Sequence, residues 1–278
     1  MAIIANTFQS YQSIGTREDL SNVIYNISPS DTPFMSMIGR GKATNTLHEW
    51  QTDAIDAVAA NARVEGDEYT YIAVVPTVRL NNQTQISSKT VIVAGTQMAT
   101  NKAGRDSEMA YQLAKHSKAL KRDMESALTG KVARAAGSTS AARTLGGFET
   151  WPTSNVSRGG GSPAGSGAGS GAAPVDAATK RDLTEALLKT VVQSCYTNGG
   201  EPSVVMVGPV NKGKVSAFTG RASARQMIDA TKIQAAADLY SSDFGDFKVI
   251  PNRFSREQTA YVIDPEFWKV VYLRDFKQ

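Results

Sequence analysis

A long run of helical spacing in the middle of the chain constrains the fold most. Within residues 105–137, apolar side chains recur at helical intervals, at Met109, Leu113, Leu120, Met124, Leu128 and Val132. Asp106 near the start and Lys131 near the end match the polarity of the helix dipole. Such a helix would span roughly 45 Å, well beyond the average length. Its single narrow apolar stripe predicts that it lies across the face of a sheet, with a bend or early end at Gly130.

The sequence from residue 182 onwards predicts an α+β body. An amphipathic helix over 182–200 places Leu183, Leu187, Val191 and Cys195 on one side, and Asn198–Gly200 closes it. Residues 203–208 form a short, wholly apolar buried strand. A short helix follows over 209–220, with Pro209 in its first turn and Gly220 at its end. Strands within 247–276 complete the chain, so the sheet is closed late, by the C-terminus.

Residues 47–96 read as extended, without a helical period. They contain an unusual stretch, 81–89, whose only apolar side chain is Ile86. A strand that packs on its own core should alternate apolar and polar residues, whereas this one is polar on both faces. A two-stranded excursion with arms of twenty residues would reach roughly 65 Å, and an isolated hairpin is marginal in water. We therefore expect this segment to need a surface to lie on.

The two remaining segments contain little that could form a core. Residues 1–46 read as an arm, with a short helix over 16–27 followed by a turn at the two prolines of SPSDTPF. Residues 158–174 are a Gly/Ser/Ala tract, which behaves as a flexible linker or loop.

The sequence lacks the residue spacing of known catalytic and nucleotide-binding motifs. GRGKAT at 39–44 lacks the glycine and the hydroxyl residue of a phosphate-binding loop, so a basic arm is the better interpretation. His48 and Glu49 lack the second histidine of a zinc protease, and His116 reads as half-buried structure. The chain has no other histidine for a Ser-His-Asp triad. We expect neither an enzyme nor a cofactor or metal site.

Composition sets further limits. A single cysteine, Cys195, excludes an internal disulfide and reads as a buried structural thiol. The acidic group around Gly66 lacks the ligand pattern of a calcium loop. The start of the chain does not read as a signal peptide, and no apolar stretch approaches the ~18 residues of a membrane span. A net charge of +4 tolerates nucleic acid nearby but does not indicate a nucleic-acid-binding protein.

Taken in order, the segments resemble major capsid proteins of tailed bacteriophages, whose fold is shared with herpesvirus shells. The resemblance rests on residues 16–39 with DTPF at Asp31–Phe34, on 75–128, and on 143–151, 204–218, 243–254 and 260–276. It is greatest to a subfamily with a short arm and no long N-terminal scaffold segment. The Gly/Ser/Ala tract departs from the family and looks like a local expansion of a surface loop.

The resemblance implies a domain organisation. It comprises an N-terminal arm (1–46), an extended β loop (47–96), a spine helix and peripheral domain (97–150, with part of the C-terminal strands), an axial domain (151–245) that contains the tract, and C-terminal strands returning to both domains' sheets (246–278).

The resemblance also implies a function. The chain would assemble as hexamers and pentamers into an icosahedral head shell around double-stranded DNA, held without sequence-specific contacts. Portal and possibly scaffold or decoration proteins would be further partners, and no membrane is involved. Assembly would occur in the bacterial cytoplasm and the product would be the virion. An encapsulin-type compartment shell of the same fold and a soluble cytoplasmic enzyme remain the alternatives.

In such shells the extended loop lies over the neighbouring subunit, which would supply the surface that the polar strand lacks. The expected inter-subunit contacts are Glu65, Asp67, Glu68, Arg79, Asn82, Gln83, Gln85 and Lys89.

Overall fold

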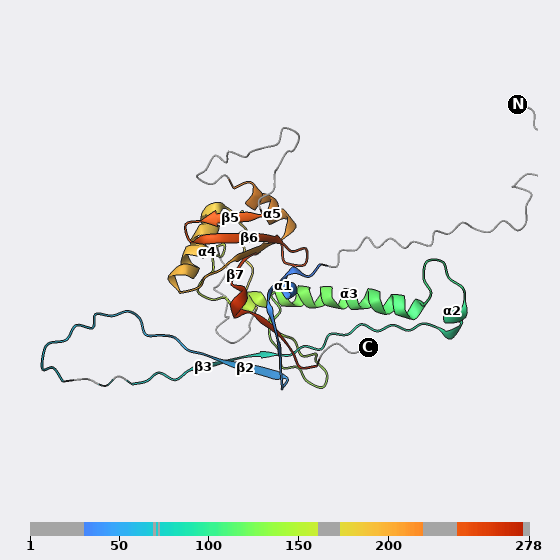
Figure 1. Cartoon of the computed structure of the whole chain (residues 1–278), viewed down its shortest axis with the longest axis horizontal. Coiled ribbons are helices and arrows are strands. Elements are labelled where there is room, and N and C mark those ends of the chain that lie inside the picture. The colour runs from blue at the N-terminus through green and yellow to red at the C-terminus, as the bar shows by residue number, and fades with distance from the viewer. Residues whose placement is uncertain (1–30, 69–70, 72, 161–172, 219–237, 275–278) are drawn as a thin grey trace, which may run out of the picture. The chain divides into compact units, whose positions relative to one another are not determined.

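The computed structural model describes residues 31–68, 71, 73–160, 173–218 and 238–274 (Figure 1). Contacts divide the chain into two units. Among the described residues, one unit holds 89–120 and the other holds 31–88 and 121–274. The predicted helix over 16–27 lies outside the described residues.

A four-stranded mixed sheet forms the centre of the second unit. Its order is β5 (Leu239–Ser242), β6 (Gly245–Pro251), β4 (Val204–Val207) and β7 (Ala260–Ile263). β4 runs parallel to β6 and antiparallel to β7, and β5 is antiparallel to β6. All four residues of β4 are buried, which confirms the predicted apolar strand. Because successive side chains alternate, β4 supplies apolar groups to both faces of the sheet.

Helices α4 (Glu185–Thr197) and α5 (Pro209–Ser216) cover one face of this sheet (Figure 1). The core on this face is formed by Leu188, Val192, Val205, Val207, Val215, Phe247 and Val249. Pro209 occupies the first turn of α5, and the closure of α4 at Asn198–Gly200 is confirmed by the bond from Gly200 N to Cys195 O (2.9 Å).

The predicted buried stripe of α4 was wrong by one position. Leu188 and Val192 are buried, whereas Leu187, Val191 and Cys195 are only half-buried. The adjacent pairs Leu187–Leu188 and Val191–Val192 give the helix a wide apolar face. Packing against the sheet therefore decides which residue of each pair is buried.

The opposite face of the sheet is covered by α1 (Pro33–Met37), the C-terminal end of α3 (Glu108–Thr129) and the short 3-10 helix η2 (Phe148–Thr150). The core here contains Phe34, Ile38, Phe148, Val204, Met206, Tyr261, Ile263 and Val270, with Leu128 of α3 packed against it. Phe148 meets the rings of Phe34 and Tyr261 edge-on, with centroids 5.9 and 5.0 Å away. Two of these core residues precede position 46, so the expectation that this part of the chain lacks core residues was wrong for 33–43.

The GRGK segment is a strand rather than part of a basic arm. β1 (Gly39–Lys42) pairs in parallel with β8 (Lys269–Tyr272), which follows the 3-10 helix η3 (Pro265–Phe267). Ala43 N continues the ladder by donating to Tyr272 O at 2.9 Å. Sequence spacing could not reveal this pairing because the two strands lie more than 220 positions apart.

The predicted long helix is α3, and its early end at Gly130 is confirmed. It has 22 residues, about 33 Å at the usual rise. In the first unit, α2 (Gly95–Ala99) begins at the end of the segment 47–96 that was expected to be extended. Glu108 opens α3 with an ion pair to Arg105 (2.5 Å), and Gln112 donates to it (2.7 Å).

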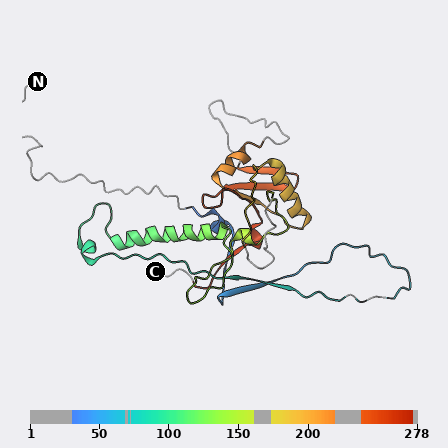
Figure 2. The same ribbon diagram turned by 180° about the vertical axis from the view of Figure 1, so that it is seen from behind.

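The extended region contains a much shorter ladder than the predicted twenty-residue arms. β2 (Leu47–Thr52) and β3 (Val78–Gln83) pair antiparallel over six residues each. Residues 53–77 between them form no strand at the positions described. Figure 2 shows this loop continuing from the end of the two strands.

A buried carboxylate, which the sequence pattern did not indicate, joins three parts of the second unit. Glu125 of α3 accepts hydrogen bonds from Phe34 N (2.7 Å), Met35 N (2.9 Å) and Asn252 Nδ2 (2.7 Å). It thereby satisfies first-turn amides of α1, whose N-cap residue Thr32 makes no side-chain cap. Burial raises the pKa of Glu125, and the three hydrogen bonds oppose that rise.

Glu125→Gln tests this junction. The amide nitrogen of glutamine would face a backbone N–H or the Asn252 amide, so one acceptor is lost. We expect the free energy of unfolding in urea to fall by about 1–3 kcal/mol. Glu201→Gln is the control, because Glu201 is exposed, and it should change the value by less than about 0.5 kcal/mol. Equal urea midpoints for the two variants would contradict the assignment.

Candidate functional site

The loop between β2 and β3 is the most exposed part of the described chain. Every described residue of 53–77 is exposed. Apolar side chains are exposed as well, and the relative solvent exposures of Ile55, Val58 and Tyr71 are 98%, 105% and 97%. Val64, Val74 and Val75 are also largely exposed. So many apolar groups on one segment indicate a contact surface.

The acidic residues predicted to contact a neighbour lie in this loop. Glu65, Asp67 and Glu68 are all exposed. Asp67 has a partner in its own chain, because Arg63 lies 3.7 Å from its carboxylate. Both side chains of that pair are about half exposed, so the pair contributes little to stability.

The polar stretch 81–89 lies against its own chain for its first half, which corrects the expectation that its surface must be another copy. Asn82 Oδ1 accepts from Gly146 N (2.9 Å), and its Nδ2 donates to Gly146 O (3.2 Å). Gln85 Oε1 accepts from Leu145 N (3.3 Å). Arg143 Nε donates to Thr84 O (2.6 Å). The sequence pattern showed a strand without an apolar face but not that a polar loop of the same chain lies beside it.

The other predicted contact residues are not gathered in one place. Arg79 lies on β3 and pairs with Glu49 of β2 at 3.7 Å. Gln83 ends β3 opposite Leu47, and Lys89 is exposed and belongs to the other contact unit. Within the second unit, the predicted set therefore divides into a loop group and a group at the base of the loop.

Aromatic side chains also hold the base of the loop. Trp50 of β2 packs against Trp151 with ring centroids 5.4 Å apart, and the ring centroid of His48 lies 6.0 Å from that of Trp50. The strands that carry the exposed loop are thereby fixed to the segment that follows η2.

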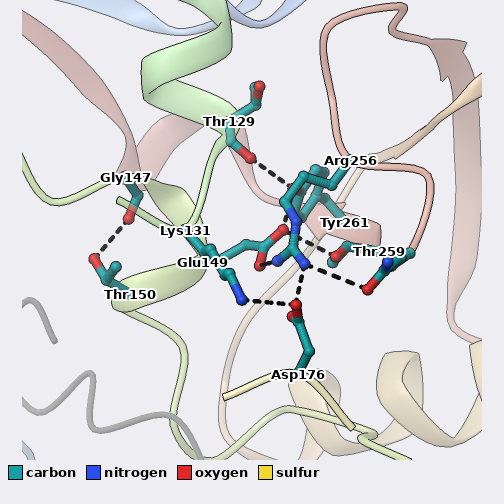
Figure 3. Close-up of polar contacts among 10 residues, drawn as sticks. Thr129, Lys131, Gly147, Glu149, Thr150, Asp176, Arg256, Thr259 and Tyr261 are labelled. Atoms are coloured by element: carbon teal, nitrogen blue, oxygen red, sulfur yellow. Dashed lines mark hydrogen bonds and ion pairs between the residues drawn. The ribbon is translucent and has the colours of Figure 1, made fainter. Parts of the chain in front are cut away.

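A second site, which sequence reasoning missed, is a network of charges around Glu149 (Figure 3). Glu149 is buried; its Oε2 lies 2.5 Å from Arg256 Nη1, and its Oε1 accepts from Thr259 (2.9 Å). The Tyr261 hydroxyl lies 2.7 Å from Glu149 Oε1 and 2.6 Å from Thr129 O. Burial, with the charge of Glu149, raises the pKa of Tyr261.

Asp176 extends this network to the residues just after the Gly/Ser/Ala tract. Its carboxylate pairs with Lys131 Nζ (2.7 Å) and Arg256 Nη2 (2.6 Å). Hydrogen bonds from these two cations lower the pKa of Asp176 to about 2. The network therefore ties the end of α3, η2, the segment after the tract and β7 together. Only the two-residue spacing of Thr259 and Tyr261 at the start of β7 could have hinted at it, since Glu149 lies 107 positions from Arg256.

The described residues offer little for catalysis. They contain no group of three or more His, Cys, Asp or Glu side chains that could hold a metal ion. His116 lines an open cleft of about 480 Å³ with Glu108 and Gln112. Burial raises the pKa of the half-buried Cys195 thiol, which makes it less reactive. No described helix is both long and apolar enough to cross a membrane.

Comparisons with known proteins agree with one another. The sequence model of the family described as SU10 major capsid protein matches residues 3–278. A curated relative, the major capsid protein of Escherichia phage Phieco32, is 29% identical over 305 aligned positions, which cover 96% of this chain and 86% of the relative.

Among solved structures, the capsid asymmetric unit of cyanophage A-1(L) contains a similar chain. The TM-score is 0.63 at 13% identity, covering 95% of this chain and 78% of the other. At this identity the likeness shows the fold alone, a mixed helix-and-strand phage capsid fold, which confirms the predicted α+β class.

Arg256→Met tests the charge network. It leaves the buried carboxylate of Glu149 without its cation, so we expect the free energy of unfolding to fall by about 2–3 kcal/mol. Lys131→Met is the matched control, because it removes only the more exposed pair with Asp176, which is worth less than about 1 kcal/mol. Urea denaturation measures both, and equal losses would contradict a buried network centred on Glu149.

The lowered pKa of Asp176 predicts a pH dependence. The carboxylate titrates at about 2 when folded and at 3.8 ordinarily. Its stabilising effect is therefore complete above about pH 5 and is lost as the pH falls towards 2. The wild-type chain should exceed Asp176→Asn in free energy of unfolding at pH 5, and the difference should vanish near pH 2. A difference that is constant across this range would contradict the shift.

Proposed function

From the membership of this chain in the SU10 major capsid protein family, we propose that it builds the icosahedral head of a tailed phage from hexamers and pentamers. The family and the curated relative establish a phage capsid protein that forms a shell with other copies of itself. The described fold is in accord with this role. The comparisons favour neither a compartment shell nor an enzyme.

One observation carries the proposal, namely the exposed apolar loop 53–77. Burying its side chains would be favourable, at about 25 cal/mol per Å² of apolar surface. No described residue of its own chain buries them. A neighbouring copy would supply the missing surface, and a head-to-tail contact of this kind closes into rings. Each contact can be modest because many copies cooperate.

The finer parts of the family architecture are assigned on the same basis. α3 is the spine helix, and the four-stranded sheet with α4 and α5 belongs to the axial domain. The loop group Glu65, Asp67 and Glu68 contacts the neighbour, whereas Asn82 and Gln85 hold the base of the loop in position. Their hydrogen bonds to residues 145 and 146 support this division.

The proposed partners follow from the role. Double-stranded DNA lies inside the shell and meets it without sequence readout, which the mild net charge of +4 permits. Portal protein, and scaffold or decoration proteins, complete the head. Assembly takes place in the bacterial cytoplasm, and the assembled chain is part of the virion.

Replacing residues 53–77 by an Asn-Gly turn tests the proposal. Thr52 and Val78 are already paired, so a two-residue turn can close the hairpin without disturbing β2 or β3. We expect a folded chain of unchanged urea midpoint that forms no shells. Negative-stain microscopy and sedimentation velocity measure assembly.

A matched variant, Ile55→Ser with Val58→Ser and Val74→Ser, keeps the length of the loop and should assemble more weakly than the wild-type chain. Shells of normal yield and size from the chain with the shortened loop would overturn the proposal.

A further inference from the structure

The turn that ends α4 contains the only Asn–Gly pair of the sequence, Asn198–Gly199. In such a pair the backbone nitrogen of the glycine can attack the side-chain amide of the asparagine, because glycine has no Cβ to obstruct the approach. Asn198 and Gly199 are both exposed, and a Cβ added at Gly199 would meet no atom within 4 Å. Water therefore reaches both of the groups that would react.

The fold restrains the side-chain amide of Asn198. Its Nδ2 donates to Asn155 Oδ1 (2.7 Å) and to Ser194 O (2.9 Å). Asn155 Oδ1 also accepts from Ser194 Oγ (2.9 Å), so one side-chain oxygen serves both residues. The amide of Asn198 must leave these two acceptors before its carbonyl carbon can turn towards Gly199.

The attacking nitrogen is restrained as well. Gly199 N donates to Tyr196 O (3.0 Å), and Gly200 N donates to Cys195 O (2.9 Å). Gly199 has a φ of 81°, the left-handed conformation that commonly closes the C-terminus of a helix. A backbone amide attacks only after it has lost its proton, and here that proton is engaged with a carbonyl. The reaction therefore depends on local opening of the turn.

We infer that Asn198 is a site of spontaneous deamidation whose rate is limited by the opening of the turn after α4. In the open turn, hydroxide removes the proton of Gly199 N, and this nitrogen bonds to Asn198 Cγ. The Cγ–Nδ2 bond breaks, and the leaving nitrogen takes a proton from water and departs as ammonia. Water then opens the resulting cyclic imide. Opening at Cγ gives aspartate, and opening at the main-chain carbonyl carbon gives isoaspartate.

Either product weakens the end of α4. Neither has the Nδ2 donor, so Asn155 Oδ1 and Ser194 O lose a hydrogen bond. Aspartate would also bring a carboxylate to the C-terminal end of the helix, where negative charge is unfavourable. Isoaspartate lengthens the main chain by one carbon within the turn. Because a subunit of an assembled virion is not replaced, the products would accumulate as the particle ages.

Peptide mapping by mass spectrometry tests the inference on the full chain, incubated at mildly alkaline pH and sampled over time. The readout is the gain in mass when –NH2 becomes –OH at position 198. We expect the folded wild-type chain to react there, and to react more slowly than the same chain in urea above its unfolding midpoint. Asn155→Ala removes one acceptor of the amide and should raise the folded rate about fivefold. Asn155→Asp keeps an acceptor oxygen and should stay near the wild-type rate.

Asn45→Ala is the control, because Asn45 is an exposed asparagine whose side chain bonds to Thr46. It should leave the rate at Asn198 unchanged, and in urea all of these chains should react at one rate. Circular dichroism checks folding, and if Asn155→Ala does not fold, the comparison of folded and unfolded wild-type chain decides. Equal rates for those two states would overturn the inference. So would a folded chain that stays unmodified, or equal folded rates for the wild-type chain and Asn155→Ala.

Discussion

The buried carboxylate of Glu125 is the interaction on which the sheet-bearing unit depends. A charge in this position is costly unless it is hydrogen-bonded, and three donors satisfy it. Two of the donors are backbone amides of α1, and the third is the Asn252 side chain after β6. The carboxylate therefore fixes α1 on one face of the sheet, and β1 follows directly to pair with β8. Apolar packing alone would bring these elements together without setting their register.

A second constraint is that the central strand of the sheet must pack on both of its faces. β4 is buried on both faces, so two cores form on a strand of only four residues. The charge network of Glu149, Arg256 and Asp176 joins three separate segments of this body. A body held in this way can hold the base of β2 and β3 in place while the described residues of the loop they carry stay exposed. That combination suits a subunit whose most exposed segment acts on a neighbour.

Much of the fold could be predicted because local patterns specify local structure. Residues 204–207 are all apolar, so a buried strand suits them best. Gly130 ends α3 because glycine has a low helix propensity. Other elements could not be predicted. β1 has the composition of a basic loop and becomes a strand only because β8 lies beside it. Leu188 and Leu187 are chemically alike, and packing alone decides which is buried.

The candidate site was likewise predictable only in part. The sequence by itself determined that residues 47–96 have no helical period, that the stretch 81–89 has no apolar face, that the chain lacks the spacing of known catalytic motifs, and that its segments follow the order of a phage capsid protein. Only the tertiary structure decided that Asn82 and Gln85 bond to their own chain, that Glu149 meets Arg256, and that β1 pairs with β8. These contacts join residues about 60 to more than 220 positions apart, and their energy depends on burial and geometry, which no local pattern contains.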